Sequence, residues 1–238
     1  MHGLILAGGE GSRLAAEGIE VPKPLLEVGG EPLILRLLAT LARLGCDTLT
    51  CMVRADFGQV FQVLAGRSFG PPLRVRACRT PSSLHTLVEG LAAAPPGPVF
   101  CSMVDTLMPD ADWQTVYAGS GGALAQGADL VLAVTPFVDD ESPLYVRLGQ
   151  DGAVQALADE PVEPPCVTGG VYGLSEAARR GAGDARAGGL ERMRGFLKWR
   201  LAQGVLVRAV MVPRILDIDH AADLRLANAW VASPEAGR

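Results

Sequence analysis

Short apolar runs alternate with amphipathic stretches along the first 136 residues of the chain. Runs of four to six residues are typical of buried strands, and apolar side chains spaced at i, i+3, i+4 and i+7 are typical of helices. We expect strands at 4–7, 48–53, 73–78, 99–104 and 130–135, and helices at 32–44, 57–65, around 84–91 and from 112 to 117. This strand–helix order predicts an α/β fold, a three-layer α/β/α sandwich around a mostly parallel sheet.

The rhythm changes after residue 136. Shorter strands are expected at 145–148, 153–157, 167–174 and 205–212, with helices ending near Gly204 and covering 223–231. The glycine-rich stretch 181–189 is predicted to be flexible and exposed. We therefore expect a single domain over 1–232, with a first half (1–136), a second half that adds a small β annex and the terminal helix (137–232), and a tail (233–238).

Composition narrows the classes of function. The chain has 238 residues, 49% of them hydrophobic, which suits one large domain. The net charge of −5 argues against a nucleic-acid partner, and no apolar run approaches the ~18 residues of a membrane span. The N-terminal apolar run stops at Gly8, so no signal peptide is expected. Five cysteines without a C-x-x-C pair and three scattered histidines indicate a reduced, cytoplasmic protein without a histidine metal site; a homo-oligomer stays possible.

A glycine-rich segment at 4–14 is the strongest chemical signal. Gly8, Gly9 and Gly11 follow the first apolar run, where they let the backbone turn sharply and leave N–H groups uncovered. Such a loop binds anions, and phosphate is the usual one. It is not a Walker loop, because no lysine follows at the required spacing, and Leu14 stands where a dinucleotide fingerprint needs its third glycine. The prolines that follow are expected to prevent a helix here.

Two cations flank this loop. Arg13 lies at its end, and Lys23 lies between Pro22 and Pro24, which stiffen the segment that carries it. Only two of the 21 basic residues are lysines, Lys23 among them. A lysine kept against this bias indicates a need for a compact ammonium group.

These residues resemble a known signature. The chain reads Leu6-Ala-Gly-Gly-Glu-Gly-Ser-Arg-Leu14 and then Pro22-Lys-Pro-Leu-Leu-Glu-Val-Gly-Gly-Glu-Pro-Leu33, and both stretches resemble the motifs of nucleotidyltransferases that make nucleotide-activated sugars and related compounds. The resemblance implies the Rossmann-like fold of nucleotide-diphospho-sugar transferases, with Arg13 and Lys23 as catalytic residues. The nucleotide-binding residues that it implies are Leu6, Ala7, Gly8, Gly9, Glu10, Gly11, Ser12, Arg13, Lys23, Pro81, Ser82 and Ser83.

The last three of these belong to a predicted helix start, with Thr80 as its cap and Pro81 in the first turn. In the resembled family a small-residue turn at this place contacts the nucleobase. A capping role alone is the simpler interpretation, and both roles are compatible. The sequence differs from the usual Gly-Thr-Ala, so the base stays open.

Asp105 ends the buried run 99–104. A carboxylate at this point can simply cap the next segment, but the family uses an aspartate here to hold Mg²⁺ between the α-phosphate and the acceptor. We therefore expect Mg²⁺ as the cofactor. Glycosyltransferases of related architecture carry Asp-x-Asp here, whereas this chain has Asp105-Thr-Leu107, which weighs against that class.

A second metal ligand is expected in the stretch 215–224, which resembles the family's late Asp-x-Asp segment. Either Asp217 or Asp219 can be this ligand. Asp219 is also a candidate N-cap of the terminal helix, so a purely structural role is possible.

We expect the first half (1–136) to bind the nucleotide and the second half (137–232) to bind the acceptor, and this second half is less clearly marked. Many sugar-nucleotide enzymes place Glu-Lys-Pro where this chain has Asp159-Glu160-Pro161, so the lysine that grips the acceptor phosphate is missing, and Thr168 and Gly169 start a stretch that resembles the following Gly-x-Tyr strand. The basic residues after residue 140 considered as its replacement are Arg147, Arg192, Arg194, Lys198 and Arg214. Arg194 and Lys198 are four apart on one predicted helix, so we expect this pair to bind the acceptor and Glu160 to bind a neutral hydroxyl of it. A solvated helix face is the alternative for the pair.

The expected reaction is transfer of NMP from an NTP to a small phosphorylated acceptor, a sugar 1-phosphate before others, with release of pyrophosphate. Cytidylyl or guanylyl transfer to phosphocholine, a sugar acid or a molybdopterin cofactor is the first alternative. A GT-A glycosyltransferase that consumes a nucleotide sugar is the alternative from another class, and a non-catalytic nucleotide sensor is the third.

Overall fold

The predicted alternation of strands and helices is present in the structure, a computed structural model that describes residues 1–139 and 141–233. Of the predicted tail, 233–238, only residue 233 is described, and 234–238 lie outside the described residues. Seven of the nine strands of the central sheet follow one another in the order β10 (Val154–Ala158), β9 (Tyr145–Leu148), β11 (Val167–Leu174), β6 (Val99–Met103), β1 (His2–Ala7), β4 (Leu49–Arg54) and β5 (Leu73–Cys78). The other two are β8 (Leu130–Thr135), which pairs with β11, and β12 (Val207–Met211), which pairs with β8.

The longest uninterrupted ladders of this sheet are parallel. β1 pairs in parallel with β4 and β6, β4 with β5, and β8 with β12. β11 runs antiparallel between β6 and β8 and extends to β9 of the annex, where β9 and β10 also pair antiparallel. The predicted α/β fold with a mostly parallel sheet is confirmed, and a single sheet passes through both halves of the chain.

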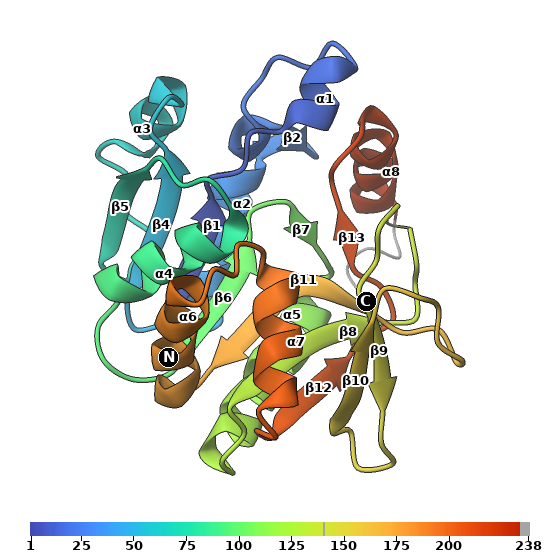
Figure 1. Cartoon of the computed structure of the whole chain (residues 1–238). Helices are drawn as coiled ribbons and strands as arrows, with labels where there is room; N and C mark the ends of the chain where they lie inside the picture. The colour runs from blue at the N-terminus through green and yellow to red at the C-terminus, as the bar shows by residue number, and fades with distance from the viewer. Residues whose placement is uncertain (140, 234–238) are drawn as a thin grey trace.

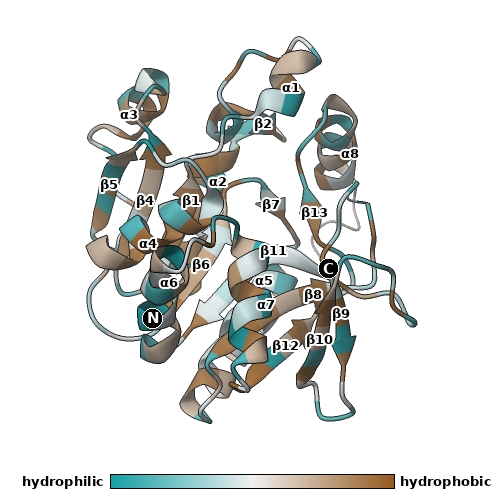
Figure 2. Ribbon diagram, in the orientation of Figure 1, coloured by the Kyte–Doolittle hydropathy of each residue, from teal (hydrophilic) through white to brown (hydrophobic). Residues whose placement is uncertain are grey.

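Helices cover both faces of the sheet (Figure 1). They are α2 (Leu33–Arg43), α3 (Gly58–Leu64), α4 (Ser83–Ala93), α5 (Asp110–Ala125), α6 (Glu176–Ala187) and α7 (Met193–Ala202). Successive residues of β1 point to opposite faces: Leu4 and Leu6 pack with α4, α6 and α7, whereas Ile5 and Ala7 pack with α2, α3 and α5. Figure 2 shows the strands as predominantly apolar between these layers. No described helix is long and apolar enough to cross a membrane.

The stretch 181–189 was expected to be flexible, and that prediction is wrong. Most of it belongs to α6, where Gly181, Ala182 and Ala185 are buried. A Cβ atom on Gly181 would lie 3.1 Å from Cδ of Arg200 in α7. The small residues therefore serve close helix packing rather than mobility, and Ser175, whose side chain accepts a hydrogen bond from the Ala178 N–H, starts the helix.

The glycine loop also continues into a helix that was not expected. Gly11 adopts a left-handed conformation with φ of 67°, and the one-turn helix α1 (Ser12–Ala16) follows directly. The prolines do not prevent this helix, because they come later in the chain. Pro22 precedes a 3-10 turn (Lys23–Leu25), and Pro24 lies within it.

A third apolar cluster joins the start and the end of the chain beside the sheet. It involves the short ribbons β2 (Glu27–Val28) with β3 (Glu31–Pro32) and β7 (Thr106–Leu107) with β13 (Leu216–Asp217), and the terminal helix α8 (Ala221–Ala232). Figure 1 shows β13 and α8 beside β7 and on the side of the molecule that carries α1 and β2. In the second ribbon Asp217 pairs with Thr106, directly after Asp105.

Two predicted caps are wrong. α8 is capped at His220 rather than Asp219, and Asp223 Oδ2 accepts hydrogen bonds from the backbone N–H groups of His220 (2.7 Å) and Asp219 (2.9 Å). The Asp219 side chain is thus free for other contacts. Likewise α4 is capped at Ser82, while the hydroxyl of Thr80 contacts that of Thr86 at 2.5 Å.

Candidate functional site

A cavity of about 690 Å³ opens at the carboxyl ends of β1 and β6, where ligands bind in sheets of this kind. It is lined by Leu6, Ala7, Gly9, Gly11, Ser12, Arg13, Lys23, Pro24, Pro81, Ser82, Ser83, Met103, Val104, Asp105, Ser142, Leu144, Thr168, Gly170, Tyr172, Arg192, Met193, Arg194, Leu197, Asp217 and Asp219. Most of the site residues expected from the sequence are in this set. Those outside it are Gly8, Glu10, Glu160, Gly169 and Lys198.

The three glycines of the loop meet different needs. A Cβ atom on Gly8 would lie 3.1 Å from Sγ of Cys78, so Gly8 permits close packing under the loop. Gly11 supplies the positive φ of the turn, while a Cβ atom on Gly9 would meet nothing within 4 Å. Gly9 therefore borders open space in the cavity. Glu10 points elsewhere, since its carboxylate pairs with Arg54 at 3.0 Å.

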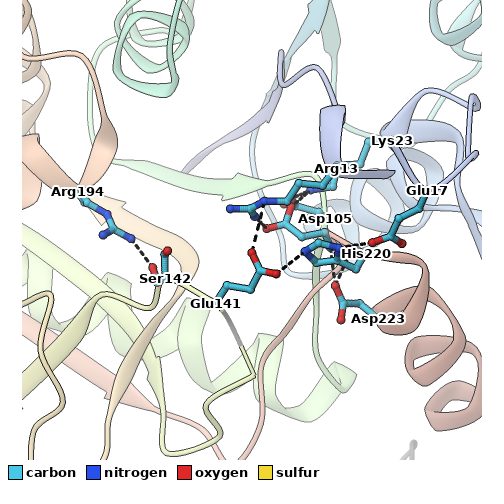
Figure 3. A network of polar contacts seen from close by, with 10 residues as sticks. Arg13, Glu17, Lys23, Asp105, Glu141, Ser142, Arg194, His220 and Asp223 are labelled. Atoms are coloured by element: carbon cyan, nitrogen blue, oxygen red, sulfur yellow. Dashed lines mark hydrogen bonds and ion pairs between the residues drawn. The ribbon is translucent and has the colours of Figure 1, made fainter. Parts of the chain in front are cut away.

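Four charged side chains meet beside the loop, and Figure 3 labels three of them, Arg13, Lys23 and Asp105; the fourth is Asp219. The ammonium of Lys23 donates to a carboxylate oxygen of Asp105 and, at 2.6 Å, to Oδ1 of Asp219. The other oxygen of Asp219 accepts from Arg13 at 2.7 Å. The two predicted catalytic cations thus share one carboxylate.

The environment fixes the charge state of this cluster. Burial lowers the pKa of Lys23, but the charges of Asp105 and Asp219 outweigh it and raise the pKa above its usual range. Burial likewise raises the pKa of Asp219, but the charge and hydrogen bond of Lys23 and the charge of Arg13 outweigh this effect and lower it. Lys23 is therefore charged and Asp219 is ionised at neutral pH.

Asp217 differs from Asp219 although the two are two residues apart. It is half-buried, and its carboxylate accepts a hydrogen bond from the Thr106 hydroxyl at 3.0 Å. Burial, followed by the nearby charge of Asp105, raises the pKa of Asp217 well above its ordinary value, against the opposing effects of Thr106 and Lys23. Asp217 therefore holds a proton more readily than Asp219, whose ionised form is favoured.

A further network surrounds Arg13, and no motif in the sequence predicted it. His220 Nδ1 lies 2.5 Å from Glu17, and His220 Nε2 lies 3.2 Å from Glu141. The same Glu141 lies 3.9 Å from Arg13, which holds Arg13 between Glu141 and Asp219. Figure 3 shows these side chains arriving from α1, from the segment after β8 and from the start of α8.

The first turn of α4 is joined to the start of α7. The hydroxyl of Ser82 donates to the carbonyl oxygen of Glu191, and the N–H of Leu84 donates to the same oxygen at 3.0 Å. The N–H of Met193 in turn donates to the hydroxyl of Ser83 at 3.0 Å. Two of the side chains expected to contact the base, those of Ser82 and Ser83, thus form hydrogen bonds with the backbone at the start of α7.

The structure separates the residues expected at the acceptor. Thr168 lines the cavity, but Gly169 does not: a Cβ atom there would lie 2.3 Å from Cδ1 of Ile215, so this glycine serves packing against the segment before β13. Its neighbour Gly170, with a φ of 70°, lines the cavity instead, as does Tyr172. The Gly-x-Tyr resemblance pointed to this strand without fixing which glycine faces the cavity.

Arg194 and Lys198 do lie together, as their spacing predicted, and both contact Asp159, at 3.1 Å and 2.5 Å. Only Arg194 lines the cavity, and it also donates to the carbonyl oxygen of Ser142. Glu160 is exposed and lies off the cavity wall. The structure thus contradicts the expected placement of Lys198 and Glu160 at the acceptor, because Asp159 draws the pair into an ion cluster.

Comparison with known proteins adds to this geometry. The mannose-1-phosphate guanyltransferase of Pichia angusta is 45% identical over 53 residues, which are 22% of this chain and 15% of that protein. The bifunctional protein GlmU of Clavibacter sepedonicus is 30% identical over 160 residues, which are 66% of this chain and 31% of that protein. The chain thus matches less than a third of the length of these relatives.

Two solved structures share the fold. The inositol-1-phosphate CTP transferase of T. maritima superposes with a TM-score of 0.75 at 17% identity, over 95% of this chain and 94% of that one. A candidate glucose-1-phosphate thymidylyltransferase from Bacillus anthracis, solved with sucrose, superposes with a TM-score of 0.82 at 21% identity, over 100% and 98%. These likenesses confirm the expected fold.

The family itself follows from a match along the sequence. The model of the MobA-like NTP transferase domain matches residues 3–200, which include the glycine loop, Lys23 and Asp105. Because this match spans most of the chain, the chain belongs to the MobA-like NTP transferase domain family of nucleotidyltransferases.

Proposed function

We propose that the protein transfers NMP from an NTP to a phosphorylated acceptor, a sugar 1-phosphate before others, and releases pyrophosphate. The observation that carries the proposal is the cluster of Lys23, Asp105 and Asp219 beside the open side of the glycine loop. It places a fixed ammonium, a second cation and ionised oxygen ligands at one end of a cavity large enough for a nucleotide and a small acceptor.

The chemistry needs no covalent intermediate on the protein. An oxygen of the acceptor phosphate attacks the α-phosphorus, a new P–O bond forms, and the bond to the β-phosphate breaks with its electron pair passing to pyrophosphate. The backbone of the glycine loop binds the triphosphate, and Arg13 and Lys23 neutralise the charge that develops on the leaving group. Glu141 and Asp219 hold Arg13 in position for this role.

Mg²⁺ fits the oxygen ligands of this site. No group of three or more acidic, histidine or cysteine side chains in the described part of the chain is arranged to hold a metal by itself. Mg²⁺ commonly uses one or two carboxylates and completes its shell with substrate phosphates and water, and Asp105 and Asp219 provide two carboxylates beside the loop. When bound, the ion would neutralise phosphate charge and bring donor and acceptor together.

The acceptor class is supported by the names of the relatives. Three of these relatives, from Pichia angusta, T. maritima and Bacillus anthracis, are named for a defined acceptor: mannose 1-phosphate, inositol 1-phosphate and glucose 1-phosphate. Their names give three different nucleotides, guanylyl, CTP and thymidylyl, so these relatives support a cyclic polyol phosphate as acceptor and leave the base open.

A substrate grid tests the proposal. CTP, GTP, UTP and dTTP are each combined with sugar 1-phosphates, inositol 1-phosphate and phosphocholine, with and without Mg²⁺, and pyrophosphate is measured. We expect release with one base and a sugar or inositol phosphate, and only with Mg²⁺. Release with phosphocholine alone would replace the acceptor class. Absence of pyrophosphate throughout, together with turnover of a nucleotide sugar, would instead indicate a glycosyltransferase.

A further inference from the structure

The wall of the cavity contains four basic side chains: Arg13, Lys23, Arg192 and Arg194. Three of them are already engaged. Lys23 and Arg13 share Asp219, and Arg194 contacts Asp159 and the carbonyl oxygen of Ser142. Arg192 is the exception, because its guanidinium forms no ion pair or hydrogen bond with any residue in 1–139 or 141–233.

The backbone of Arg192 is nevertheless firmly held. The carbonyl oxygen of Glu191, one residue before it, accepts hydrogen bonds from Ser82 and Leu84. The N–H of Met193, one residue after it, donates to Ser83. The carbonyl oxygen of Arg192 itself accepts from the N–H of Phe196 at 3.2 Å. An exposed arginine on a fixed backbone, facing a cavity without a partner, is suited to bind an anion that the protein does not supply.

The triphosphate already has its binding groups in the glycine loop, Arg13 and Lys23, so it does not require Arg192. An acceptor phosphate that enters beside a triphosphate meets strong repulsion and needs a cation of its own. Next to Arg192, the apolar side chains of Met193, Leu197 and Leu144 line the same wall and suit the apolar face of a sugar ring.

We propose that Arg192 binds the anionic group of the acceptor, a phosphate monoester. The inference deepens the proposed function and rests on it for the identity of the acceptor. It also replaces Lys198 as the acceptor cation, since Lys198 lies off the cavity wall.

The first test uses inorganic phosphate as the probe. The whole chain is first saturated with inorganic tripolyphosphate, which occupies the triphosphate site. Arginine side-chain NMR follows the titration for the wild type, Arg192→Met and Arg180→Met. Arg180 is an exposed arginine of α6 that does not line the cavity, so its variant removes the same charge and serves as the control. We expect Arg192→Met to weaken phosphate binding about tenfold, as for loss of a charged hydrogen-bonding partner, and Arg180→Met to bind like the wild type.

Equal phosphate affinity in both variants would overturn the proposal. So would a shift of the Arg192 resonance on addition of tripolyphosphate alone, with no further shift on addition of phosphate, because the anion would then belong to the NTP. With a substrate pair from the pyrophosphate grid, Arg192→Met should raise the acceptor KM about tenfold and leave the NTP KM unchanged. Absence of pyrophosphate release from every substrate pair of the grid would refute the proposed reaction. The difference in phosphate binding between the two variants would still establish the anion site.

Discussion

The Nζ atom of Lys23 lies 2.6 Å from Oδ1 of Asp219, although 196 residues separate the two in the chain. The same ammonium contacts Asp105, and Lys23 is only 9% exposed. Lys23 is therefore a structural counter-ion for two carboxylates as well as the cation expected to meet the triphosphate. A change at this residue should affect stability and turnover together.

Lys23→Met is the direct test of that double role. We expect turnover to fall at least about a hundredfold, as for loss of a preorganised charge, and the free energy of unfolding to fall by roughly 1 to 3 kcal/mol because Asp105 and Asp219 lose their shared cation. Pyrophosphate release and urea denaturation measure the two effects. Normal turnover per folded molecule in a destabilised variant would leave Lys23 with the structural role alone.

The two late aspartates should respond differently to the same substitution. Asp217 holds a proton more readily than an ordinary aspartate, and asparagine resembles the protonated form, so Asp217→Asn should change turnover less than about fivefold. Asp219→Asn removes an ionised partner of both Arg13 and Lys23 and should lower Mg²⁺-dependent turnover about a hundredfold or more. Measuring turnover against Mg²⁺ concentration separates them. The reverse order of effects would make Asp217 the more important ligand.

Two glycine-to-alanine variants distinguish a glycine that borders the ligand cavity from a glycine that is needed for close packing. Gly9 borders open space, so Gly9→Ala should keep the melting temperature of the wild type and raise the NTP KM by crowding the phosphates. At Gly169 a Cβ atom would lie 2.3 Å from Ile215, so Gly169→Ala should destabilise the fold by about 1 to 3 kcal/mol. Thermal unfolding and NTP kinetics distinguish the two. A destabilised Gly9→Ala protein with an unchanged NTP KM would remove Gly9 from the binding surface.

His2 should make stability depend on pH. Burial, with a smaller effect from the charge of Arg179, lowers its pKa from 6.5 to about 4. The unfolded chain therefore binds a proton more readily than the fold, so the contribution of His2 is complete above pH 6.5 and is lost as the pH falls toward 4.

The measurement is the free energy of unfolding between pH 7 and pH 4, for the wild type and for His2→Asn. The wild type should lose up to about 3 kcal/mol more over this interval, since each unit of pKa corresponds to about 1.4 kcal/mol. Parallel pH profiles for the two proteins would show that His2 does not titrate as the structure indicates.

The sequence predicted those features that depend on local pattern. Apolar runs gave the strands, and the spacing of Gly8, Gly9 and Gly11 gave the loop, because both follow from backbone geometry and burial over a few residues. Contacts between distant segments could not be derived this way. Helical spacing placed Arg194 and Lys198 on one face, but Asp159, from the annex, decides where that face points.

Composition misled where small residues have two uses. Glycine and alanine at 181–189 suggested mobility, yet they allow α6 to pack closely against α7 at Arg200. Similarly, Arg192 carries no local motif. Its assignment as an anion ligand depends on the hydrogen bonds that join the start of α7 to α4, and these form between segments far apart in the sequence.

The pairing of β13 with β7 has a consequence for how this protein can be shortened. The match to the family ends at residue 200, whereas Asp217 and Asp219 lie beyond it. An expression fragment cut at the family boundary would keep the glycine loop, Lys23 and Asp105 but would leave the ammonium without Asp219, and β8 without its edge partner β12. Fragments designed from similarity alone would thus separate the charge cluster from its last member, so trimming should stop no earlier than the end of α8.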